Sequence, residues 1–383
     1  MKRRRWLQWG CAQCACLAGL AGAQAPAWSP PPRFARPDPA GEEGGLWALM
    51  DREEARLRRS PLRLRDEALT RYLTETACRL SGEHCPDLRV YALRTPYFNA
   101  SMAPNGMMQV WSGLLLRMEN EAQMSAILAH EIGHFLQRHT LQQLRDVKSR
   151  TALATALSVF GVYGLVGQLL VMGSAFAFSR DQEREADAIG VVLMRKVGYD
   201  TREAPKVWGN LLAELAANPA AAENSLDGIL FATHPTSEER RRTLEREAAG
   251  GGGQVGAEAW RQMLAPLRPM LLEDELKRGR LDESLVLLNR MVAAEPDSAE
   301  LRYYRGEVRR LRAADGDLAL ALADLDAATR DPQAPVQAWR ALGYLQRQQR
   351  QFEAARAAWT RYLELAPDAA DAALIRQSME ELP

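Results

Sequence analysis

The feature that most constrains this chain of 383 residues is the segment AILAHEIGHFLQRH, residues 126 to 139. It contains three of the chain's five histidines, and its apolar residues recur at helical spacing without an interrupting proline. The pattern predicts a helix over residues 126–137. On such a helix His130 and His134 lie one turn apart on the same face, so both imidazoles can reach a common point.

A common point between two imidazoles suits a zinc ion, the arrangement that a helical His-Glu-x-x-His supplies. Glu131 is rotated by about 100° from His130, so it borders the ion without binding it. There it can take a proton from a water at the metal and pass it to a leaving amine. The alternative is a chance pattern on an amphipathic helix. His139 is nine residues past His130, about half a turn around the axis, so it points away from the metal, and we expect it to be structural.

A catalytic zinc site uses three protein ligands and one open position. A second helix is predicted in SRDQEREADAIGVVLMRKVGYD, residues 179 to 200. Glu183 and Asp187 share one face of this helix, so one carboxylate can bind the metal while the other accepts a hydrogen bond from a ligand imidazole. The alternative is an exposed acidic helix start favoured by the helix dipole, which we expect for Asp181 and Glu185.

With these residues the chain resembles the gluzincin metallopeptidases of the HtpX type. The family pattern maps onto His130 and His134 as ligands, Glu131 as the catalytic base, Glu183 as the third ligand and Asp187 as the partner of a ligand histidine. The resemblance implies one zinc ion per chain. It also implies an α+β fold that is mostly helical, with a small β-sheet in the peptidase domain.

The resemblance extends from about residue 95 to about residue 240. THPTSEER, residues 233 to 240, places His234 and Arg240 at the family's spacing. His234 can stabilise a developing oxyanion, or it can plug the open metal position and keep the enzyme latent. We expect the plug. The alternative is a loop histidine, with Arg240 in a structural salt bridge.

YFNASMAPNGMMQVWSGLLL, residues 97 to 116, resembles the family's edge-strand segment before the zinc helix. We expect substrate to bind as an added strand along the segment from Met107 to Trp111, which includes Gln109, with Asn99 nearby. Pairing of this kind uses the backbone and gives little sequence preference. The alternative is an ordinary core strand.

The first 23 residues have a basic start, an apolar middle and small residues at the end, which predicts a cleaved secretory signal and a periplasmic protein. A membrane anchor or a lipid-modified cysteine is the less favoured alternative. Basic and acidic residues are equal at 49 each, so nothing indicates nucleic acid. In an exported chain, Cys78 and Cys85 favour a disulfide over a metal pair.

Residues 151–178 carry no charge and are long enough for one membrane span. A single crossing would place His130 and Glu183 on opposite sides of the bilayer. We therefore expect a hairpin or two short helices over the active site, which can also rest against a membrane or a client protein.

Composition along the rest of the chain indicates where its domains begin and end. Residues 24–45 are rich in proline and predict an extended or disordered leader, and four consecutive glycines indicate a flexible linker at 248–257. The peptidase domain then covers 46–247. Residues 258–383 are expected to form tetratricopeptide repeats, because VQAWRALGYLQRQQRQFEAARAAWTRYLELAPD, from residue 336, matches that pattern. The alternative is a generic helical bundle.

Together these features predict an exported zinc endopeptidase that degrades misfolded or stalled envelope proteins. The resemblance to exported members with such repeats implies quality control of outer-membrane β-barrels. The repeat groove would bind a protein partner, such as the barrel assembly machinery. The competing hypothesis is a chaperone or scaffold with an inert zinc site, but a structural site has no use for the base Glu131.

Overall fold

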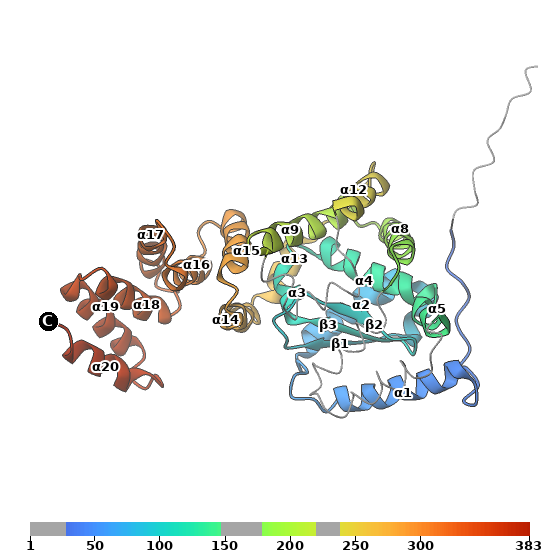
Figure 1. The fold of residues 1–383 in the computed structure, drawn as a ribbon, viewed down its shortest axis with the longest axis horizontal. Coiled ribbons are helices and arrows are strands. Elements are labelled where there is room, and N and C mark those ends of the chain that lie inside the picture. Colours follow the sequence, from blue (N-terminus) through green and yellow to red (C-terminus); the bar gives the residue numbers. More distant parts are fainter. Residues whose placement is uncertain (1–27, 147–177, 220–237) are drawn as a thin grey trace, which may run out of the picture. The chain divides into compact units, whose positions relative to one another are not determined.

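The computed structural model describes residues 28–146, 178–219 and 238–383 (Figure 1). Residues 32–383 form one compact unit. The predicted signal peptide at 1–23, all of the apolar run 151–178 except Phe178, and His234 lie outside the described residues. None of the helices in the described ranges is long and apolar enough to cross a membrane.

The amino-terminal part is an α+β structure in which helices surround one small sheet, as the sequence predicts. Its helices, with two short 3-10 turns, are α1 (Glu42–Leu57), α2 (Glu67–Ser81), η1 (Gly82–Asp87), α3 (Ser112–Arg117), α4 (Glu121–Leu136), α5 (His139–Asp146), α8 (Arg180–Lys196), η2 (Thr201–Glu203), α9 (Ala204–Ala216) and α12 (Glu238–Glu247).

The sheet has three strands, β1 (Arg89–Leu93), β2 (Ala100–Met102) and β3 (Met107–Trp111), in the order β1-β3-β2. β3 is parallel to β1 and antiparallel to β2, so its backbone is hydrogen-bonded on both sides. The expectation that substrate pairs along the segment from Met107 to Trp111 is therefore wrong. All five residues of β3 are buried, and β2 is the strand at the edge.

Helix α4 lies at the centre of this part, and all sixteen of its residues are buried. Asn120 begins it by accepting a hydrogen bond from the Gln123 amide, 2.8 Å away. Helix α8 begins at Ser179 with a capping box to Gln182 and is followed by Gly198 at φ 85°. The two helices that the spacing predicts are thus both present, within a few residues of the expected bounds.

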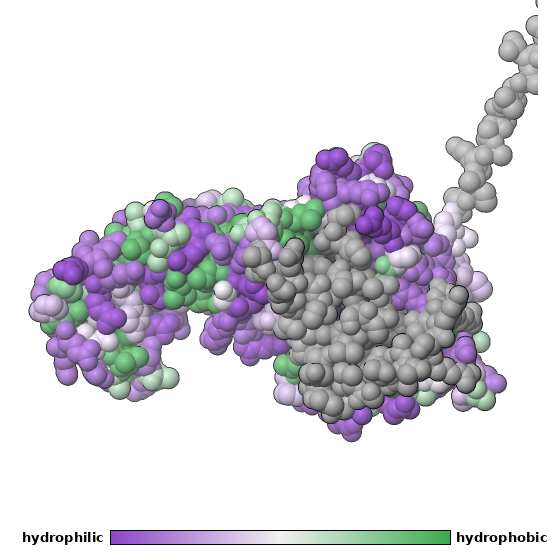
Figure 2. Space-filling view, in the orientation of Figure 1, coloured by the Kyte–Doolittle hydropathy of each residue, from purple (hydrophilic) through white to green (hydrophobic). Residues whose placement is uncertain are grey.

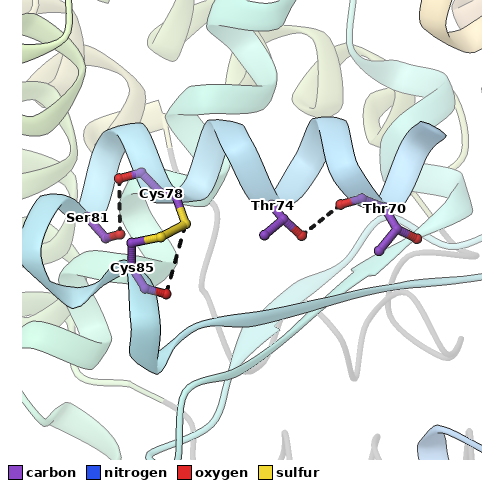
Figure 3. The surroundings of a disulfide bond; sticks show 5 residues. All are labelled: Thr70, Thr74, Cys78, Ser81 and Cys85. Carbon is purple, nitrogen blue, oxygen red and sulfur yellow. Dashed lines mark hydrogen bonds between the residues drawn. A yellow bond between two sulfur atoms is a disulfide. The ribbon is translucent and has the colours of Figure 1, made fainter. Parts of the chain in front are cut away.

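A disulfide joins Cys78, near the end of α2, to Cys85 in η1 (Figure 3). The chain reverses at Gly82, whose φ of 59° is a conformation that residues with a side chain rarely adopt. The Ser81 hydroxyl donates a hydrogen bond to the Cys78 carbonyl at the same corner. The disulfide therefore fixes the connection between α2 and the start of β1.

The segment 248–257, expected to be a flexible linker, is held against the peptidase part. The Gln254 amide donates to the Gly198 carbonyl at 2.9 Å, and the Ala122 amide donates to the Val255 carbonyl at 3.0 Å. Gly253 permits this packing, because a Cβ there would lie 2.3 Å from the Gly198 carbonyl oxygen. Glycine here permits close approach, so the expectation of a flexible linker is wrong.

The leader is also anchored in its described part. Arg33 makes two hydrogen bonds with the Asp87 carboxylate, and the Phe34 ring packs against the rings of His84 and Phe135. Residues 33–38 form no helix or strand, and α1 begins at Glu42, within the segment expected to be a leader. Phe135 belongs to α4, so the leader contacts the helix that carries His130 and His134.

The carboxy-terminal part is entirely helical in the described residues (Figure 1). Its helices are α13 (Ala257–Leu264), α14 (Arg268–Arg278), α15 (Leu281–Ala294), α16 (Ala299–Arg312), α17 (Asp317–Thr329), α18 (Gln337–Gln348), α19 (Phe352–Leu365) and α20 (Ala372–Glu380). Trp260 of α13 is 1% exposed and donates to the Met118 carbonyl, so α13 packs with the peptidase part.

Later helices contact in the pairs α16–α17 and α18–α19. In each pair a glycine of the first helix admits a large side chain of the second: Gly306 faces Leu325, and Gly343 faces Trp359. Leu325 and Trp359 are 34 residues apart, the length of a tetratricopeptide unit. This packing supports the repeat interpretation, which stays a prediction.

A buried ion network connects the two parts. Arg117 of α3 is 5% exposed and lies 2.7 Å from Glu214 of α9 and 3.1 Å from Glu275 of α14. Arg278 pairs with Glu275, and Arg290 of α15 pairs with Glu214. Burial acts to raise the pKa of Glu275, but Arg117 and Arg278 hold it at about 2. Arg117 with Glu275 and Arg290 with Glu214 are therefore the ion pairs that cross the boundary between the two parts.

Candidate metal centre

His130, His134 and Glu183 meet at one buried point. The first two lie one turn apart on α4, and Glu183 reaches them from the first turn of α8. Their exposed fractions are 4%, 2% and 2%. One nitrogen or oxygen from each residue lies within 4.8 Å of the others. The structure thus brings together the three ligands that the sequence predicts.

The spacing of these atoms fits a tetrahedral metal ion. The Nε2 atoms of His130 and His134 are 3.1 Å apart, and they lie 3.5 Å and 3.4 Å from the nearer oxygens of Glu183. Bonds of about 2.0–2.1 Å to a tetrahedral zinc ion separate the ligand atoms by about 3.3 Å. The cluster can therefore hold an ion of this size with little movement.

The charge around the cluster also fits a divalent cation. Glu131, Glu183 and Asp187 are all at most 6% exposed, and Arg240 is the basic residue buried beside them in the described structure. Three carboxylates and one guanidinium carry a formal charge of about −2, which one zinc ion would neutralise. Buried charges of one sign are costly unless such a partner is present.

Asp187 lies behind His130, where the sequence predicts a partner for a ligand. Its Oδ1 is 2.9 Å from His130 Nδ1, which leaves Nε2 facing the cluster. Arg240 donates to both Asp187 oxygens, at 2.7 Å and 2.9 Å. Burial acts to raise the pKa of Asp187, but the charge and hydrogen bonds of Arg240 and the bond to His130 lower it to about 2. Asp187 is therefore a carboxylate that can fix the His130 tautomer.

Arg240 forms buried ion pairs with Glu183 and Asp187, so it makes the structural salt bridge that the alternative interpretation expects. Its Nη1 lies 2.6 Å from Glu183 Oε2, and its guanidinium lies 4.2 Å from the centre of the Trp208 ring. Burial acts to lower the pKa of Arg240, but the neighbouring carboxylates raise it above its usual value. This cation therefore links the third ligand to Asp187, and Trp208 of α9 covers it.

His139 differs from the expectation that it points away from the site. Its Nδ1 is 2.9 Å from His134 Nδ1, and its side chain is fully buried. The helical extrapolation fails because α4 ends at Leu136 and Arg138 adopts φ 57°, which turns the chain back before α5 begins. Burial lowers the pKa of His139. Glu185, expected to be merely an exposed charge, lies 3.3 Å from His139 Nε2.

The sequence patterns did not predict two aromatic residues that contact the ligand histidines. The Phe178 ring stacks on the His134 ring with 3.9 Å between their centres, and the Trp208 ring meets the His130 ring edge-on at 6.4 Å. Both are large apolar residues in segments without a recognisable motif. Their position next to the ligands depends on how α8 and α9 pack, which spacing alone does not show.

The predicted substrate residues lie on the sheet beside α4. Asn99 precedes β2, and its carbonyl accepts a hydrogen bond from the Trp111 amide. Met107 and Gln109 belong to β3 and are 3% and 4% exposed, so they form part of the core. Met102, at the end of β2, lines the same small cavity as His134. Of the three strands, β2 is therefore the one that could pair with an extended substrate.

A buried His-Glu-x-x-His helix, joined by a glutamate from a second helix, defines a gluzincin-type metallopeptidase domain. Residues 63–248 match the model of Peptidase family M48. The chain therefore contains a domain of peptidase family M48, in agreement with the sequence-based prediction.

Two kinds of relative share this domain. The mitochondrial metalloendopeptidase OMA1 of Arabidopsis thaliana is 30% identical over 155 residues, which cover 40% of this chain and 30% of the relative. The β-barrel assembly-enhancing protease of Escherichia coli strain K12 is 27% identical over 201 residues, which cover 48% of this chain and 40% of the relative. The alignments thus span less than half the length of these relatives.

Proposed function

We propose that this chain is an exported zinc endopeptidase that hydrolyses peptide bonds in misfolded or misassembled envelope proteins. The observation that carries the proposal is the buried cluster of His130, His134 and Glu183, whose atoms are separated by 3.1–3.5 Å. Zinc in this position would supply a Lewis acid and acidify a water molecule at the open coordination site.

The residues of the chain then have distinct tasks. Glu131 is buried on α4 next to His130, where it accepts the proton of the attacking water and returns it to the leaving amine. Asp187 holds the His130 ring, and Arg240 holds Glu183 and Asp187 in place. The plug role of His234 remains a prediction about a residue outside the described structure.

The edge of β2 is the proposed substrate site. In the antiparallel ladder Asn99 and Ala103 bond to β3, so Ala100 and Met102 direct their amides and carbonyls away from it. No strand in the described residues pairs with this side of β2. An extended substrate can add there through its backbone, which suits a peptidase that acts on unfolded segments.

The proposed clients and location rest on similarity. One set of relatives is named for β-barrel assembly, and this supports outer-membrane protein quality control in the periplasm. The carboxy-terminal helices expose apolar side chains, and Figure 2 shows hydrophobic surface among their hydrophilic residues. The exposed leucines are Leu311, Leu320, Leu365 and Leu374. Such a surface supports a protein partner on the helical part, for which we propose the assembly machinery.

The test compares purified wild type with Glu131→Gln in zinc content and in cleavage of unfolded casein. We expect one zinc ion per chain in both proteins and cleavage by wild type alone. A zinc-containing wild type without cleavage of casein or of unfolded barrel proteins would favour the chaperone hypothesis. Equal cleavage by both proteins would refute the role of Glu131.

A further inference from the structure

The two histidines of α4 have different supports behind them. His130 is backed by the Asp187 carboxylate, whereas His134 is backed by the imidazole of His139 at 2.9 Å. His139 is backed in turn by Glu185 at 3.3 Å. Gln137 also donates a hydrogen bond to Glu185, which holds that carboxylate at the end of the series.

When His134 is a ligand, only one placement of protons satisfies the hydrogen bonds that run from His134 through His139 to Glu185. The ligand atom is Nε2, which faces His130 and Glu183, so Nε2 must keep its lone pair. The proton of His134 is then on Nδ1 and is donated to Nδ1 of His139. The proton of His139 is on Nε2 and is donated to Glu185, an acceptor.

We propose that His139 and Glu185 are positioning residues that fix the ring and the tautomer of His134 for metal binding. This inference rests on the proposed metal site and deepens it. A neutral imidazole acceptor replaces the usual carboxylate or carbonyl behind a ligand histidine. It adds no charge to a site that already holds Glu131, Glu183 and Asp187 in its interior.

The backbone explains how a residue five positions after His134 can take this role. Arg138 adopts φ 57° between α4 and α5, so the chain doubles back and His139 returns to the buried side of His134. A straight helix would place these two side chains on different faces. The left-handed conformation is unfavourable for arginine, and such conformations often mark functional sites.

The decisive variants differ in where they offer an acceptor. In His139→Asn, the side-chain oxygen is as many bonds from Cα as Nδ1 of histidine, so it can still accept from His134. In His139→Gln, the polar atoms are one bond farther and miss that position. His139→Ala removes the acceptor altogether. Glu185→Gln keeps an acceptor oxygen but loses the charge.

The first measurement is zinc affinity, by competition with a chromophoric chelator. We expect His139→Ala and His139→Gln to weaken binding by roughly 10–100-fold, and His139→Asn to restore most of it. His84→Ala is the control, because His84 is also a buried histidine and packs against Phe135 of the same helix. It should lower stability and leave the zinc affinity within about twofold of wild type.

The second measurement is the tautomer of His134 in metal-free protein, from long-range proton–nitrogen spectra of labelled histidine. We expect the Nδ1-protonated form in wild type and His139→Asn, and a mixture in His139→Gln. A merely structural role of His139 would alter the unfolding of the metal-free protein without changing this tautomer or the order of zinc affinities.

Unchanged zinc affinity in His139→Ala, or a His134 tautomer that does not depend on residue 139, would overturn the inference. If His139→Ala does not fold, the comparison of His139→Asn with His139→Gln decides in its place. If wild type binds no zinc, the proposed function fails, and the tautomer spectra of the metal-free protein still test the inference separately.

Discussion

Gly133 of α4 lies directly against the backbone of Ala186 in α8. A Cβ on Gly133 would come to 3.0 Å from the Ala186 carbonyl oxygen, and one on Gly190 would come to 3.3 Å from the His130 amide nitrogen. Glycines at both crossings let the two helices approach closely enough for Glu183 to reach the histidines. The metal centre thus depends on the separation of two helix backbones.

We therefore expect Gly133→Ala to weaken zinc binding and proteolysis together. The added methyl group must push backbone atoms of α8 away by a few tenths of an ångström, which moves Glu183 out of position. The control is Gly45→Ala on α1, where a Cβ would meet no atom within 4 Å. That variant should stabilise the protein by about 0.5–1 kcal/mol and keep full zinc affinity. Unchanged zinc affinity in Gly133→Ala would argue against this dependence.

Asp187→Asn should lower zinc affinity or activity by roughly 10–100-fold. The amide can still contact His130, but it removes the charge that pairs with Arg240 and allows the wrong imidazole tautomer. Metal titration and single-turnover proteolysis would measure the two effects. Asp181→Asn is the matched control, because its side chain is 86% exposed on the same helix. Wild-type zinc affinity and activity in Asp187→Asn would contradict the role of Asp187 in orienting His130.

Proline substitution along β2 should separate substrate binding from folding. The Ala100 amide points away from β3, so Ala100→Pro removes the proposed hydrogen bond to substrate while the pairing with β3 is kept. We expect KM for an unfolded substrate to rise at least several-fold, with little change in thermal stability. Ser101→Pro is the contrast, because Ser101 pairs with Gln109 and its loss should destabilise the sheet. Equal KM values for Ala100→Pro and wild type would exclude this edge as the binding site.

The stability of the protein should fall as pH decreases from about 4.5 to about 2. Glu275 has a folded pKa of about 2, below the ordinary value of 4.5, so its ionised form stabilises the folded state above that range and is lost within it. The shift corresponds to a contribution on the order of 3 kcal/mol. Denaturant unfolding of wild type and Glu275→Gln across this range should show a difference that shrinks as pH falls.

The control for this pH series is Glu364→Gln. Glu364 forms an exposed pair with Arg361, with side chains 56% and 50% exposed. Its removal should change the free energy of unfolding by less than about 1 kcal/mol. A difference between wild type and Glu275→Gln that stays constant with pH would contradict the role of the buried carboxylate.

Helical spacing predicts much of the metal centre. His130, His134, Glu183 and Asp187 lie on two regular helices, where residues four apart must share a face. Sequence alone could not place His139, because the turn depends on a left-handed arginine, which no residue type signals. Nor could it order the strands: the edge position of β2 follows from the pairing of β3 with β1, which are separated along the chain.

The glycines at 250–253 show a second kind of feature that sequence alone could not predict. Runs of glycine usually indicate flexibility, but Gly251 and Gly253 of this run lie in close contact with Thr201 and Gly198, respectively. The same residue type permits both loose and tight structures, since it lacks a side chain. Only the neighbouring atoms decide between them, and those neighbours come from a distant part of the chain.

The ion network of Arg117, Glu214 and Glu275 also limits how this protein can be dissected. Ending the chain after α13 would remove Glu275 and Arg290 and leave Arg117 and Glu214 without their partners across the boundary. Arg117 and Glu214 would keep only each other, 2.7 Å apart, and would lose the opposite charges that share their burial. A truncated peptidase part would be a weakened protein, and the intact chain should melt in one cooperative step.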